Sequence, residues 1–388
     1  MRELVTVWGY EMEEAFRYAD DLGPVKIIHV YEPALGLKGV LVVDNVAAGP
    51  SIGGLRMAPD VTTRECVRLA RAMTMKNAAA ELPHGGGKSV LMADPNMPVS
   101  GKEELVRAFA SALRDSREYI FGPDMGTNEE CMAWVRDEIG RSVGLPRELG
   151  GIPLDEIGAT GWGVAHAAEV AADYCGVELR NARVVVQGFG AVGKFAARFL
   201  AERGAVLVGV SDSRGVASDP GGLDIDTLVD LKQSGRSVAD YPGGTKDDLD
   251  TVVDIDCDIW IPAARPDVLR ADNVTRLNTK MIVQGANIPA TIEAEAILHD
   301  RGVVNVPDFI ANAGGVICAA MEFRGSSEAA VFASIEEKVR RNTKMVLDAA
   351  LSSNISPRQA ALDLARARVT RAMGYRRWTV FSSAPGFV

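Results

Sequence analysis

Histidine and cysteine are scarce in this chain of 388 residues, which contains four histidines and five cysteines. The cysteines are scattered, odd in number and form no CxxC pair, so the sequence offers neither a disulfide framework nor a zinc ligand set. Because the few histidines are dispersed along the chain, a catalytic metal would also have few candidate ligands. We therefore expect no metal site, and reduced thiols of the kind found in cytoplasmic proteins.

An excess of positive charge and long apolar runs are also missing. The formal net charge of −10 argues against nucleic acids and anionic membranes as partners, because both require a basic surface. No apolar run has membrane-spanning length, and residues 1–18 show no signal-peptide arrangement. We therefore predict a soluble cytoplasmic protein without a nucleic-acid or membrane partner.

The length of the chain and a change of pattern near residue 150 predict two domains. After this point strands alternate with helices, as in a doubly wound α/β fold. The predicted strands cover residues 183–187, 205–210, 258–261, 281–283 and 303–306.

The first 150 residues mix helices and strands without that alternation. Helical periodicity over 1–23 and 62–80 predicts helices, and Thr62 or Thr63 is a plausible N-cap of the second. Further helices are predicted at 103–115 and 128–139. The C-terminal part, 326–373, is also predicted to be helical, with breaks at Asn342, Ser353 and Pro357. β-branched residues predict strands at 26–31 and 38–45. The segment AGPSIGGLRMAP at 48–59 is interpreted as a glycine-rich loop.

A dinucleotide fingerprint lies between a predicted strand and a predicted helix. It comprises Gly188, Phe189, Gly190, Ala191, Val192 and Gly193. The first glycine permits a tight turn, the second lets the backbone approach a pyrophosphate, and the third allows close packing of helix and strand. The helix N-terminus then favours the phosphates.

An acidic residue, Asp212, follows 24 residues after Gly188. It would accept hydrogen bonds from the adenosine ribose and repel a 2′-phosphate, which favours NAD. Ser213 and Arg214 come next and could instead hold that phosphate, so NADP stays open.

The segment from His84 to Ser89, HGGGKS, presents Lys88 behind three glycines. A phosphate-binding P-loop would require a glycine where the chain has Leu82, so that interpretation fails. The alternative is chemistry on an amino or 2-oxo acid, whose carboxylate needs a cation and whose nitrogen needs a proton shuttle. Lys76 could bind the carboxylate, Lys88 could act as a general base toward water, and Asp124 could exchange a proton with the amine. The glycines would let the substrate lie against the backbone beside Lys88.

Eight stretches of the chain together resemble the glutamate/leucine/phenylalanine/valine dehydrogenase family in order and spacing. They are residues 49–56, 73–77, 82–88, 123–126, 159–164, 188–193, 284–287 and 312–316. The resemblance implies reversible oxidative deamination of an L-amino acid to a 2-oxo acid and ammonia with NAD or NADP. It assigns carboxylate binding to Lys76 and catalysis to Lys88 and Asp124. It also places Gly53 and Gly54 at the substrate, and Thr160, Asn287 and Asn312 around the nicotinamide and the reacting carbon.

The resemblance also implies how the chain is organised. Residues 1–155 and about 330–388 would form an α/β substrate-binding and oligomerisation domain, completed by the C-terminal helices. Residues 156–329 would form the Rossmann domain, and the protein would be a homo-oligomer, a hexamer or octamer.

The substrate side chain is predicted from two positions. Glutamate-specific members of the family have a lysine where this chain has Ile52 and a serine where it has Ala319, and these groups hold a side-chain carboxylate. Without them a buried carboxylate would lack partners, at a cost of several kcal/mol. We therefore predict a preference for apolar side chains, with Met73 and Val316 as further pocket walls. Glutamate is the alternative, since Arg56 or Arg265 could reach the pocket.

Two other classes of function are weighed against an amino acid dehydrogenase. A non-catalytic nucleotide sensor would not need Lys76, Lys88 and Asp124 together. An amine dehydrogenase would not need Lys76 as a carboxylate clamp.

Overall fold

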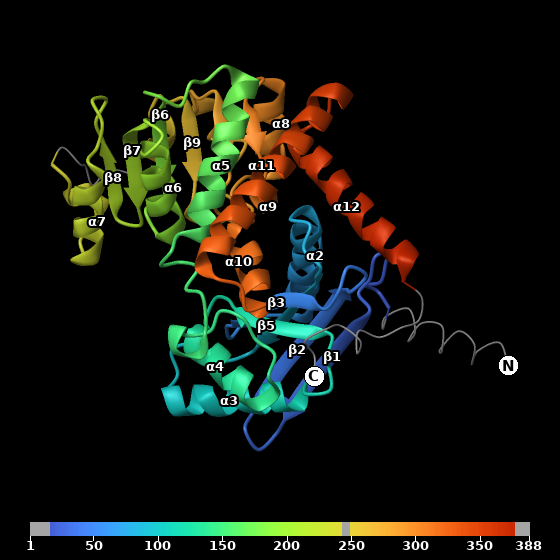
Figure 1. Ribbon diagram of the computed structural model, residues 1–388. Helices are drawn as coiled ribbons and strands as arrows, with labels where there is room; N and C mark the ends of the chain where they lie inside the picture. The colour runs from blue at the N-terminus through green and yellow to red at the C-terminus, as the bar shows by residue number, and fades with distance from the viewer. Residues whose placement is uncertain (1–15, 243–248, 377–388) are drawn as a thin grey trace. The chain divides into compact units, whose positions relative to one another are not determined.

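The computed structural model describes residues 16–242 and 249–376, which form two compact units (Figure 1). The first unit contains residues 16–152, Glu322–Gly325 and 365–376, and the second contains Pro153–Met321 and Ser326–Leu364. The expected division near residue 155 lies close to the observed one. Residues 326–364 group with the second unit, although those from about 330 onward were expected in the first domain. Most of the helix predicted over 1–23 lies outside the described residues.

A five-stranded mixed sheet forms the centre of the first unit. Its strands are β1 (Lys26–Glu32), β2 (Leu37–Asn45), β3 (Ser51–Met57), β4 (Gly85–Leu91) and β5 (Tyr119–Pro123), in the order β1-β2-β4-β3-β5. Strand β3 runs parallel to both β4 and β5, whereas β2 is antiparallel to β1 and β4. The carboxyl ends of three parallel strands therefore lie side by side.

Strand β3 corrects the prediction of a loop over residues 48–59. Six of its seven residues are buried, and it lies between β4 and β5. Its glycines, which in the sequence resemble a turn, are there because neighbouring atoms are too close for side chains. A Cβ on Gly53 would stand 1.8 Å from the carbonyl oxygen of Gly87.

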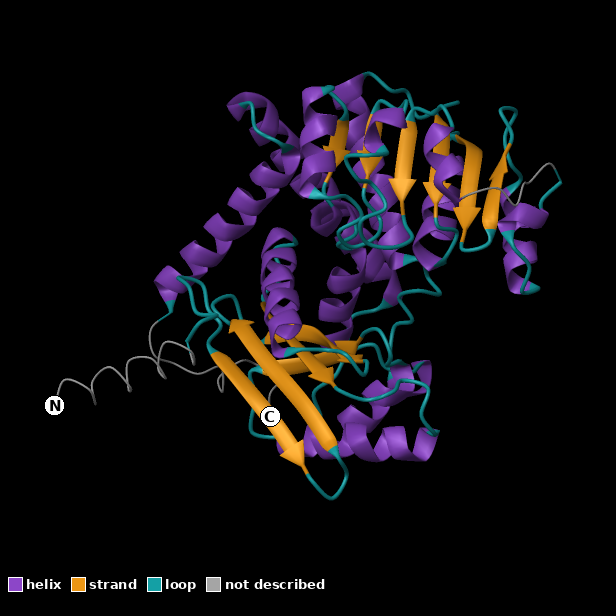
Figure 2. Ribbon diagram, turned by 180° about the vertical axis from the view of Figure 1, so that it is seen from behind, coloured by secondary structure: helices purple, strands orange, loops and turns teal. Residues whose placement is uncertain are grey.

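Helices cover both faces of this sheet (Figures 1 and 2). Alternate residues of β2 point to opposite faces, as strand geometry requires. Leu41 and Val43 pack in the core with α3 (Val99–Ala112) and α4 (Glu129–Ile139), while Val40 and Val42 pack with α2 (Thr63–Ala79). As predicted, Thr62 caps α2, its side chain accepting a hydrogen bond from the backbone N–H of Glu65.

A six-stranded sheet in the order β11-β10-β9-β6-β7-β8 forms the centre of the second unit. Five strands are parallel and β8 is antiparallel to β7, which confirms the predicted doubly wound pattern. The strands are β6 (Arg183–Gln187), β7 (Val206–Asp212), β8 (Gly215–Ser218), β9 (Ile259–Pro262), β10 (Met281–Val283) and β11 (Val304–Val306).

The helices of the second unit include α5 (Ala159–Cys175), α6 (Ala191–Ala201), α7 (Ile225–Gln233), α8 (Ile292–Asp300), α9 (Asp308–Ala311) and α11 (Glu328–Ser353). Short 3-10 turns lie at η2 (Val238–Asp240), η3 (Leu249–Asp254) and η4 (Val274–Arg276), and η1 (Arg147–Leu149) belongs to the first unit. Helices α10 (Gly314–Phe323) and α12 (Pro357–Tyr375) each contribute residues to both units.

The end of α12 returns to the first unit, as predicted for the C-terminal helices. Arg368 donates hydrogen bonds to the carbonyl oxygens of Ala78 and Ala79, at 3.3 and 2.6 Å, at the C-terminal end of α2. Cations are favoured at this end of a helix, so α12 fixes the end of α2. Among the described residues, no helix combines the length and apolar character that crossing a bilayer requires.

Candidate active site

Lys88 and Asp124, predicted to act together, form an ion pair in the first unit. The Lys88 ammonium nitrogen lies 2.7 Å from Oδ2 of Asp124. Lys88 lies within β4, and Asp124 directly follows β5. The Lys88 side chain is only 7% exposed, whereas that of Asp124 is 24% exposed. The aspartate is therefore the member of the pair that solvent or a ligand can reach.

Arg56 is a third member of this cluster, and the sequence indicated it only as a possible pocket cation. Its Nε lies 2.9 Å from the same Oδ2 of Asp124, and its Nη1 lies 2.7 Å from Oε1 of Glu65. Burial acts to raise the pKa of Asp124, but the charges of Lys88 and Arg56 outweigh it and the pKa is lowered. Asp124 is therefore an anion held by two cations at one oxygen.

Gly54 lies directly against this ion pair. A Cβ there would stand 2.7 Å from Cβ of Asp124 and 3.1 Å from the Lys88 ammonium nitrogen. Any side chain at this position would have to displace the pair. Gly54 therefore lets β3 approach the two charged groups.

The three glycines before Lys88 were predicted to let the substrate lie against the backbone. The structure shows instead that other parts of the protein pack against them. A Cβ on Gly85 would stand 1.8 Å from the carbonyl oxygen of Asn45, and one on Gly86 would stand 2.0 Å from the backbone nitrogen of Thr74. At Gly87 the ring of Tyr119 would be 2.9 Å away. The space freed by the glycines is filled by the protein itself. The glycines let α2 and the neighbouring segments pack against β4, rather than expose β4 to a substrate.

Tyr119 is a buried support of the site that the sequence motifs do not reveal. Its hydroxyl donates a 2.7 Å hydrogen bond to the carbonyl oxygen of Gly53 and lies 3.1 Å from Oγ of Ser89. Burial raises its pKa well above the usual value, so the phenol stays protonated. It links β5 with β3 and β4 next to Lys88. No signal in the sequence indicates this contact.

The other predicted substrate residues of the first unit lie on two of its elements. Lys76 and Met73 are half-buried on α2, Lys76 in its last turn. Ile52 is buried in β3, opposite Gly86 of β4 and Ile120 of β5. Val316 and Ala319 are half-buried on α10, in the part of that helix that belongs to the second unit. The shared side-chain pocket of these residues stays a prediction.

His84 is buried and edge-on to the ring of Phe323, with ring centroids 6.1 Å apart. Burial lowers its pKa to about 4, so the imidazole is neutral near pH 7. Its Nδ1 lies 3.1 Å from the carbonyl oxygen of Pro50. These contacts are those of a packing residue.

The predicted fingerprint connects β6 to α6 in the second unit, as its spacing requires. Gly188 has a φ of +101°, which disfavours a side chain. A Cβ on Gly193 would stand 2.0 Å from the carbonyl oxygen of Gly188, so this glycine allows α6 to pack closely. At Gly190, the N-cap of α6, a Cβ would have no described atom within 4 Å. The glycine that should face a pyrophosphate is therefore the one with open space, and the site fits a dinucleotide.

Asp212 lies at the end of β7, where predicted, but its carboxylate is already occupied. Oδ2 accepts hydrogen bonds from the Lys232 ammonium at 2.7 Å and the backbone N–H of Val238 at 3.1 Å. Oδ1 accepts from the Ser237 hydroxyl and the backbone N–H of Arg214, both at 2.8 Å. The side chain is 5% exposed. This differs from the expected role as ribose acceptor, because both oxygens have their partners within the chain.

Asn312 and Asn287, predicted near the nicotinamide, are in contact. The Asn312 amide nitrogen donates to Oδ1 of Asn287 at 3.0 Å and to the carbonyl oxygens of Gly285 and Ala286, each at 3.2 Å. Its own Oδ1 is buried and has no hydrogen-bond partner among the described residues. Thr160 lies in the first turn of α5, next to the start of α10, where a Cβ on Gly315 would stand 3.2 Å from its Oγ1.

A buried charge cluster lies beneath the loop of Asn287. Arg358 of α12 forms a two-pronged ion pair with Glu295 and contacts Oδ1 of Asp308 at 3.1 Å. Oδ2 of Asp308 accepts a 2.8 Å hydrogen bond from the backbone N–H of Ile288, whose φ is +50°. The buried amide of Gln284 bonds to both Glu295 and Arg358. The cluster holds the loop in a conformation that β-branched residues rarely adopt.

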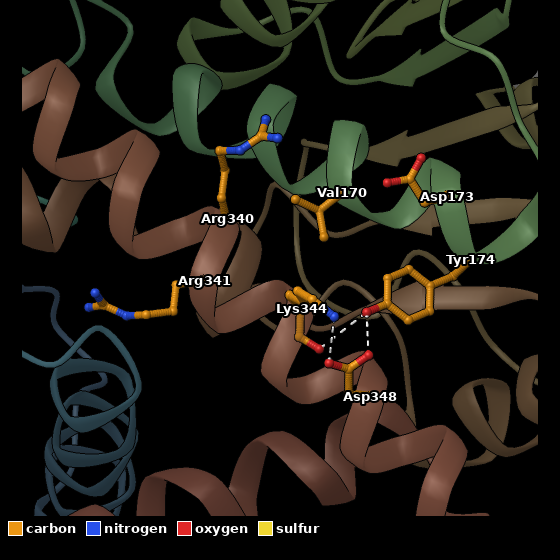
Figure 3. Close-up of a pocket in the computed structure, with 7 residues that line it drawn as sticks. All are labelled: Val170, Asp173, Tyr174, Arg340, Arg341, Lys344 and Asp348. Carbon is orange, nitrogen blue, oxygen red and sulfur yellow. Dashed lines mark hydrogen bonds and ion pairs between the residues drawn. The ribbon is translucent and has the colours of Figure 1, made fainter.

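A surface hollow of 490 Å³ lies between α5 and α11 of the second unit (Figure 3). Within it, Asp348 accepts hydrogen bonds from the Tyr174 hydroxyl at 2.6 Å and the Lys344 ammonium at 2.8 Å. Arg340 and Arg341 pair with Glu169 and Glu337, which do not line the hollow. None of the predicted site residues lines it. Within 16–242 and 249–376, no group of three or more acidic, histidine or cysteine side chains is placed to hold a metal ion.

Comparison with known proteins tests the family. Residues 25–141 match the family described as Glu/Leu/Phe/Val dehydrogenase, dimerisation domain. Residues 150–377 match the family described as Glutamate/Leucine/Phenylalanine/Valine dehydrogenase. Together the two matches cover most of the chain.

Among curated relatives, the chain is 38% identical over 358 residues to glutamate dehydrogenase of Aeropyrum pernix, covering 86% of this chain and 85% of the relative. It is 38% identical to NADP-specific glutamate dehydrogenase of Saccharolobus shibatae, with 78% of this chain and 74% of the relative covered. NAD-specific glutamate dehydrogenase of Staphylococcus aureus is 36% identical, with coverage of 86% and 85%.

A solved structure agrees with these matches. The hetero-hexameric glutamate dehydrogenase of Thermus thermophilus, in a leucine-bound form, superposes with a TM-score of 0.81 at 28% identity, covering 97% of this chain and 98% of that one. The chain therefore belongs to the glutamate/leucine/phenylalanine/valine dehydrogenase family and is an NAD(P)-dependent amino acid dehydrogenase.

Proposed function

We propose that this protein catalyses the reversible oxidative deamination of L-glutamate to 2-oxoglutarate and ammonia with NAD or NADP. The observation that carries the chemistry is the Lys88–Asp124 pair, in which a buried cation lies against a partly exposed anion. Glutamate is favoured over apolar amino acids because the relatives at 36–38% identity are glutamate dehydrogenases. This replaces the apolar preference expected from Ile52 and Ala319 as the leading hypothesis.

Substrate binding and proton transfer are assigned to different residues. A bound nicotinamide would supply the acceptor for the hydride that leaves Cα of the substrate. Lys76 binds the α-carboxylate, and Asp124 takes a proton from the amino group through its exposed side. Lys88, once its ammonium has released a proton, takes one proton of the water that attacks the iminium carbon. Asp124 returns its proton to the amino nitrogen as ammonia leaves, and the remaining hydroxyl proton is released to solvent as the carbonyl forms. Gly53 and Gly54 let β3 lie close to β4 and to the ion pair, which would bring the backbone of β3 beside the substrate.

The cofactor is held by the second unit. The backbone N–H groups at the start of α6 bind the pyrophosphate across Gly190, together with Phe189, Ala191 and Val192 of the same turn. Thr160, Asn287 and Asn312 lie around the nicotinamide. The buried Oδ1 of Asn312, which has no partner among the described residues, supports this role because the carboxamide of a nicotinamide could donate to it.

A second candidate substrate class is favoured by one observation. Ile52 is buried in β3 between Gly86 and Ile120, and it has no charge to offer to a side-chain carboxylate. Leucine, valine and phenylalanine are therefore the alternatives.

The test is a panel of initial rates with glutamate, leucine, valine, phenylalanine and tryptophan, each with NAD and with NADP. We expect the highest kcat/KM with glutamate. Faster turnover of leucine, valine or phenylalanine would reverse the choice of substrate class. Ile52→Lys sharpens the result, since a new ammonium should raise kcat/KM for glutamate and lower it for leucine. Absence of turnover with the whole panel would contradict the proposed reaction.

We also propose a homo-oligomer of six or eight subunits. Assembly is supported by the match of residues 25–141 to a dimerisation domain, and six subunits by the relative of Thermus thermophilus, which is a hetero-hexamer. Light scattering coupled to size exclusion would give the number of subunits, and a monomer would contradict the proposal.

A further inference from the structure

We infer that the adenosine end of the dinucleotide site selects a 2′-phosphate, and that Asp212 is a positioning residue for this selection and not the ribose acceptor. The inference rests on the proposed dinucleotide binding and names the form of cofactor preferred. It starts from the hairpin that joins β7 to β8, in which Asp212 pairs with Gly215 and the turn consists of Ser213 and Arg214.

The first argument is the loss of acceptor capacity at Asp212. A carboxylate that reads a ribose must offer at least one oxygen to the two hydroxyl groups. Here four donors already occupy the two oxygens, one of them an ammonium, and the side chain is 5% exposed. Displacing Ser237, which is buried, would leave its hydroxyl without this partner.

The second argument concerns charge. The repulsion that an acidic residue exerts on a 2′-phosphate depends on its negative charge being unopposed. The Lys232 ammonium, 2.7 Å from Oδ2, opposes that charge directly. Burial acts to raise the pKa of Asp212. The hydrogen bonds from Lys232, from Ser237 and from the backbone N–H groups of Arg214 and Val238 outweigh it and lower the pKa to about 2. The pair thus carries no net charge near neutral pH.

The third argument is the character of the turn. Ser213 and Arg214 are both exposed, and the Arg214 guanidinium donates a 2.9 Å hydrogen bond to the carbonyl oxygen of Gly235. Within the described residues it forms no ion pair with a carboxylate. Arginine presents several donors in a fixed plane that suits a phosphate. The Asp212–Lys232 pair and Arg214 together carry one net positive charge. This charge would attract a 2′-phosphate but would add little to the binding of a neutral ribose hydroxyl.

Each residue of the turn and its neighbours has a separate role in binding the 2′-phosphate. Arg214 and Ser213 bind the 2′-phosphate, and Lys232 cancels the repulsion that Asp212 would otherwise exert on it. Asp212 orients the turn through the backbone N–H of Arg214 and fixes the Lys232 ammonium. Asp212 does not itself touch the ribose.

The experiment measures binding of 2′,5′-ADP and of 5′-AMP to the full-length protein by isothermal titration calorimetry, without substrate or turnover. A charged hydrogen-bonded contact contributes about 1.5–3 kcal/mol, so we expect 2′,5′-ADP to bind at least about tenfold more tightly. Arg214→Ala should remove most of this preference and leave the affinity for 5′-AMP unchanged.

Two further variants make the test specific. Arg236→Ala removes an exposed arginine of the same region that is paired with Asp240, and it should leave both affinities unchanged. Asp212→Asn should weaken 5′-AMP binding only if Asp212 holds the ribose, so an unchanged 5′-AMP affinity is expected. Equal or tighter binding of 5′-AMP by the wild-type protein would overturn the inference, as would binding of neither nucleotide. Tight binding of 2′,5′-ADP without turnover of any amino acid would instead contradict only the proposed reaction.

Discussion

The Lys88–Asp124–Arg56 cluster of the first unit and the Arg358–Glu295–Asp308 cluster of the second are built from the same kinds of groups. Both combine carboxylates with cations at hydrogen-bonding distance. They differ in how exposed their carboxylates are and in how many hydrogen bonds these carboxylates can still accept. Asp124 receives both cations at one oxygen and remains 24% exposed.

The carboxylates of the second cluster, by comparison, are inaccessible and fully hydrogen-bonded. Glu295 and Asp308 are almost completely buried, and each of their four carboxylate oxygens has a donor from Arg358, Gln284 or the backbone of Ile288. Buried charge by itself therefore does not indicate a catalytic site. The difference lies in unused hydrogen-bonding capacity at a position that a ligand can reach.

Removing the cation of the first cluster should have the largest effect, and it should act on turnover. Lys88→Met deletes the proton-transfer group, and because general acid–base groups contribute about 10²–10⁴-fold, we expect kcat to fall about 10³-fold. Arg56 still pairs with Asp124, so the thermal melting temperature should change little. Initial rates and a thermal melt measure both effects. Retention of more than a tenth of wild-type kcat would contradict the role of Lys88.

Removing the cation of the second cluster should produce the opposite pattern. Arg358→Met leaves Glu295 and Asp308 as buried carboxylates without a counter-ion, which costs about 3 kcal/mol of stability. The melting temperature should fall by several degrees. Arg341→Met is the matched control, because its pair with Glu337 on α11 is exposed and should contribute less than about 0.5 kcal/mol. Equal melting temperatures for the two variants would show that the cluster does not stabilise the unit.

Gly86 and Gly190 allow a second comparison, between a glycine whose surroundings are filled by the protein and a glycine with open space beside it. In Gly86→Ala the new methyl group would stand 2.0 Å from the backbone nitrogen of Thr74, so overpacking should cost about 1–3 kcal/mol. Gly190→Ala meets no described atom within 4 Å, so it should leave stability unchanged and weaken nucleotide binding. Thermal melts and titration with NADH and NADPH separate the two outcomes. Stronger destabilisation by Gly190→Ala than by Gly86→Ala would refute this assignment.

The smallest expected effect is a shift in pH dependence. Burial acts to raise the pKa of Asp124, but Lys88 and Arg56 lower it overall. Arg56→Gln removes one of these cations and should move the acidic limb of kcat upward by about one pH unit. A pH profile from about pH 4 to about pH 9 measures the shift.

The same substitution predicts the sign of a stability change. A carboxyl group with a lowered folded-state pKa contributes stability above its unfolded value of about 3.9, and this stability is lost as the pH falls through the folded pKa. In Arg56→Gln the folded pKa lies closer to the unfolded value, so this contribution is smaller and its loss is complete at a higher pH than in the wild type. An unchanged acidic limb would mean that Arg56 does not control the protonation of Asp124.

The sequence predicts those features whose signals are local. The strand–glycine–helix unit at Gly188, the N-cap at Thr62 and the β6 strand are each encoded within a few neighbouring residues, and the structure contains them. The family resemblance placed Lys88 and Asp124 at one site, and the structure brings them to 2.7 Å.

The features that were missed depend on residues far apart in the sequence. The glycines of β3 and β4 resemble a loop until Thr74, Asn45 and Tyr119 are seen to fill the space beside them. The hydrogen bonds that Asp212 accepts from Lys232 and Ser237, which lie on later segments, are likewise not encoded next to it in the sequence. A motif gives the position of a carboxylate along the chain, but not the number of hydrogen bonds that it has already accepted.

The return of α12 to the first unit also has a consequence for biosynthesis. This unit consists of residues up to Ile152 and of segments that include 365–376, and Arg368 binds the last carbonyl groups of α2. About 200 residues must be translated between the two, which takes about 10–40 s at about 5–20 residues per second. During that time α2 lacks its final partner while the second unit is already emerging. The unit that contains Lys88 and Asp124 is therefore the last to be completed, although its first strand is made early.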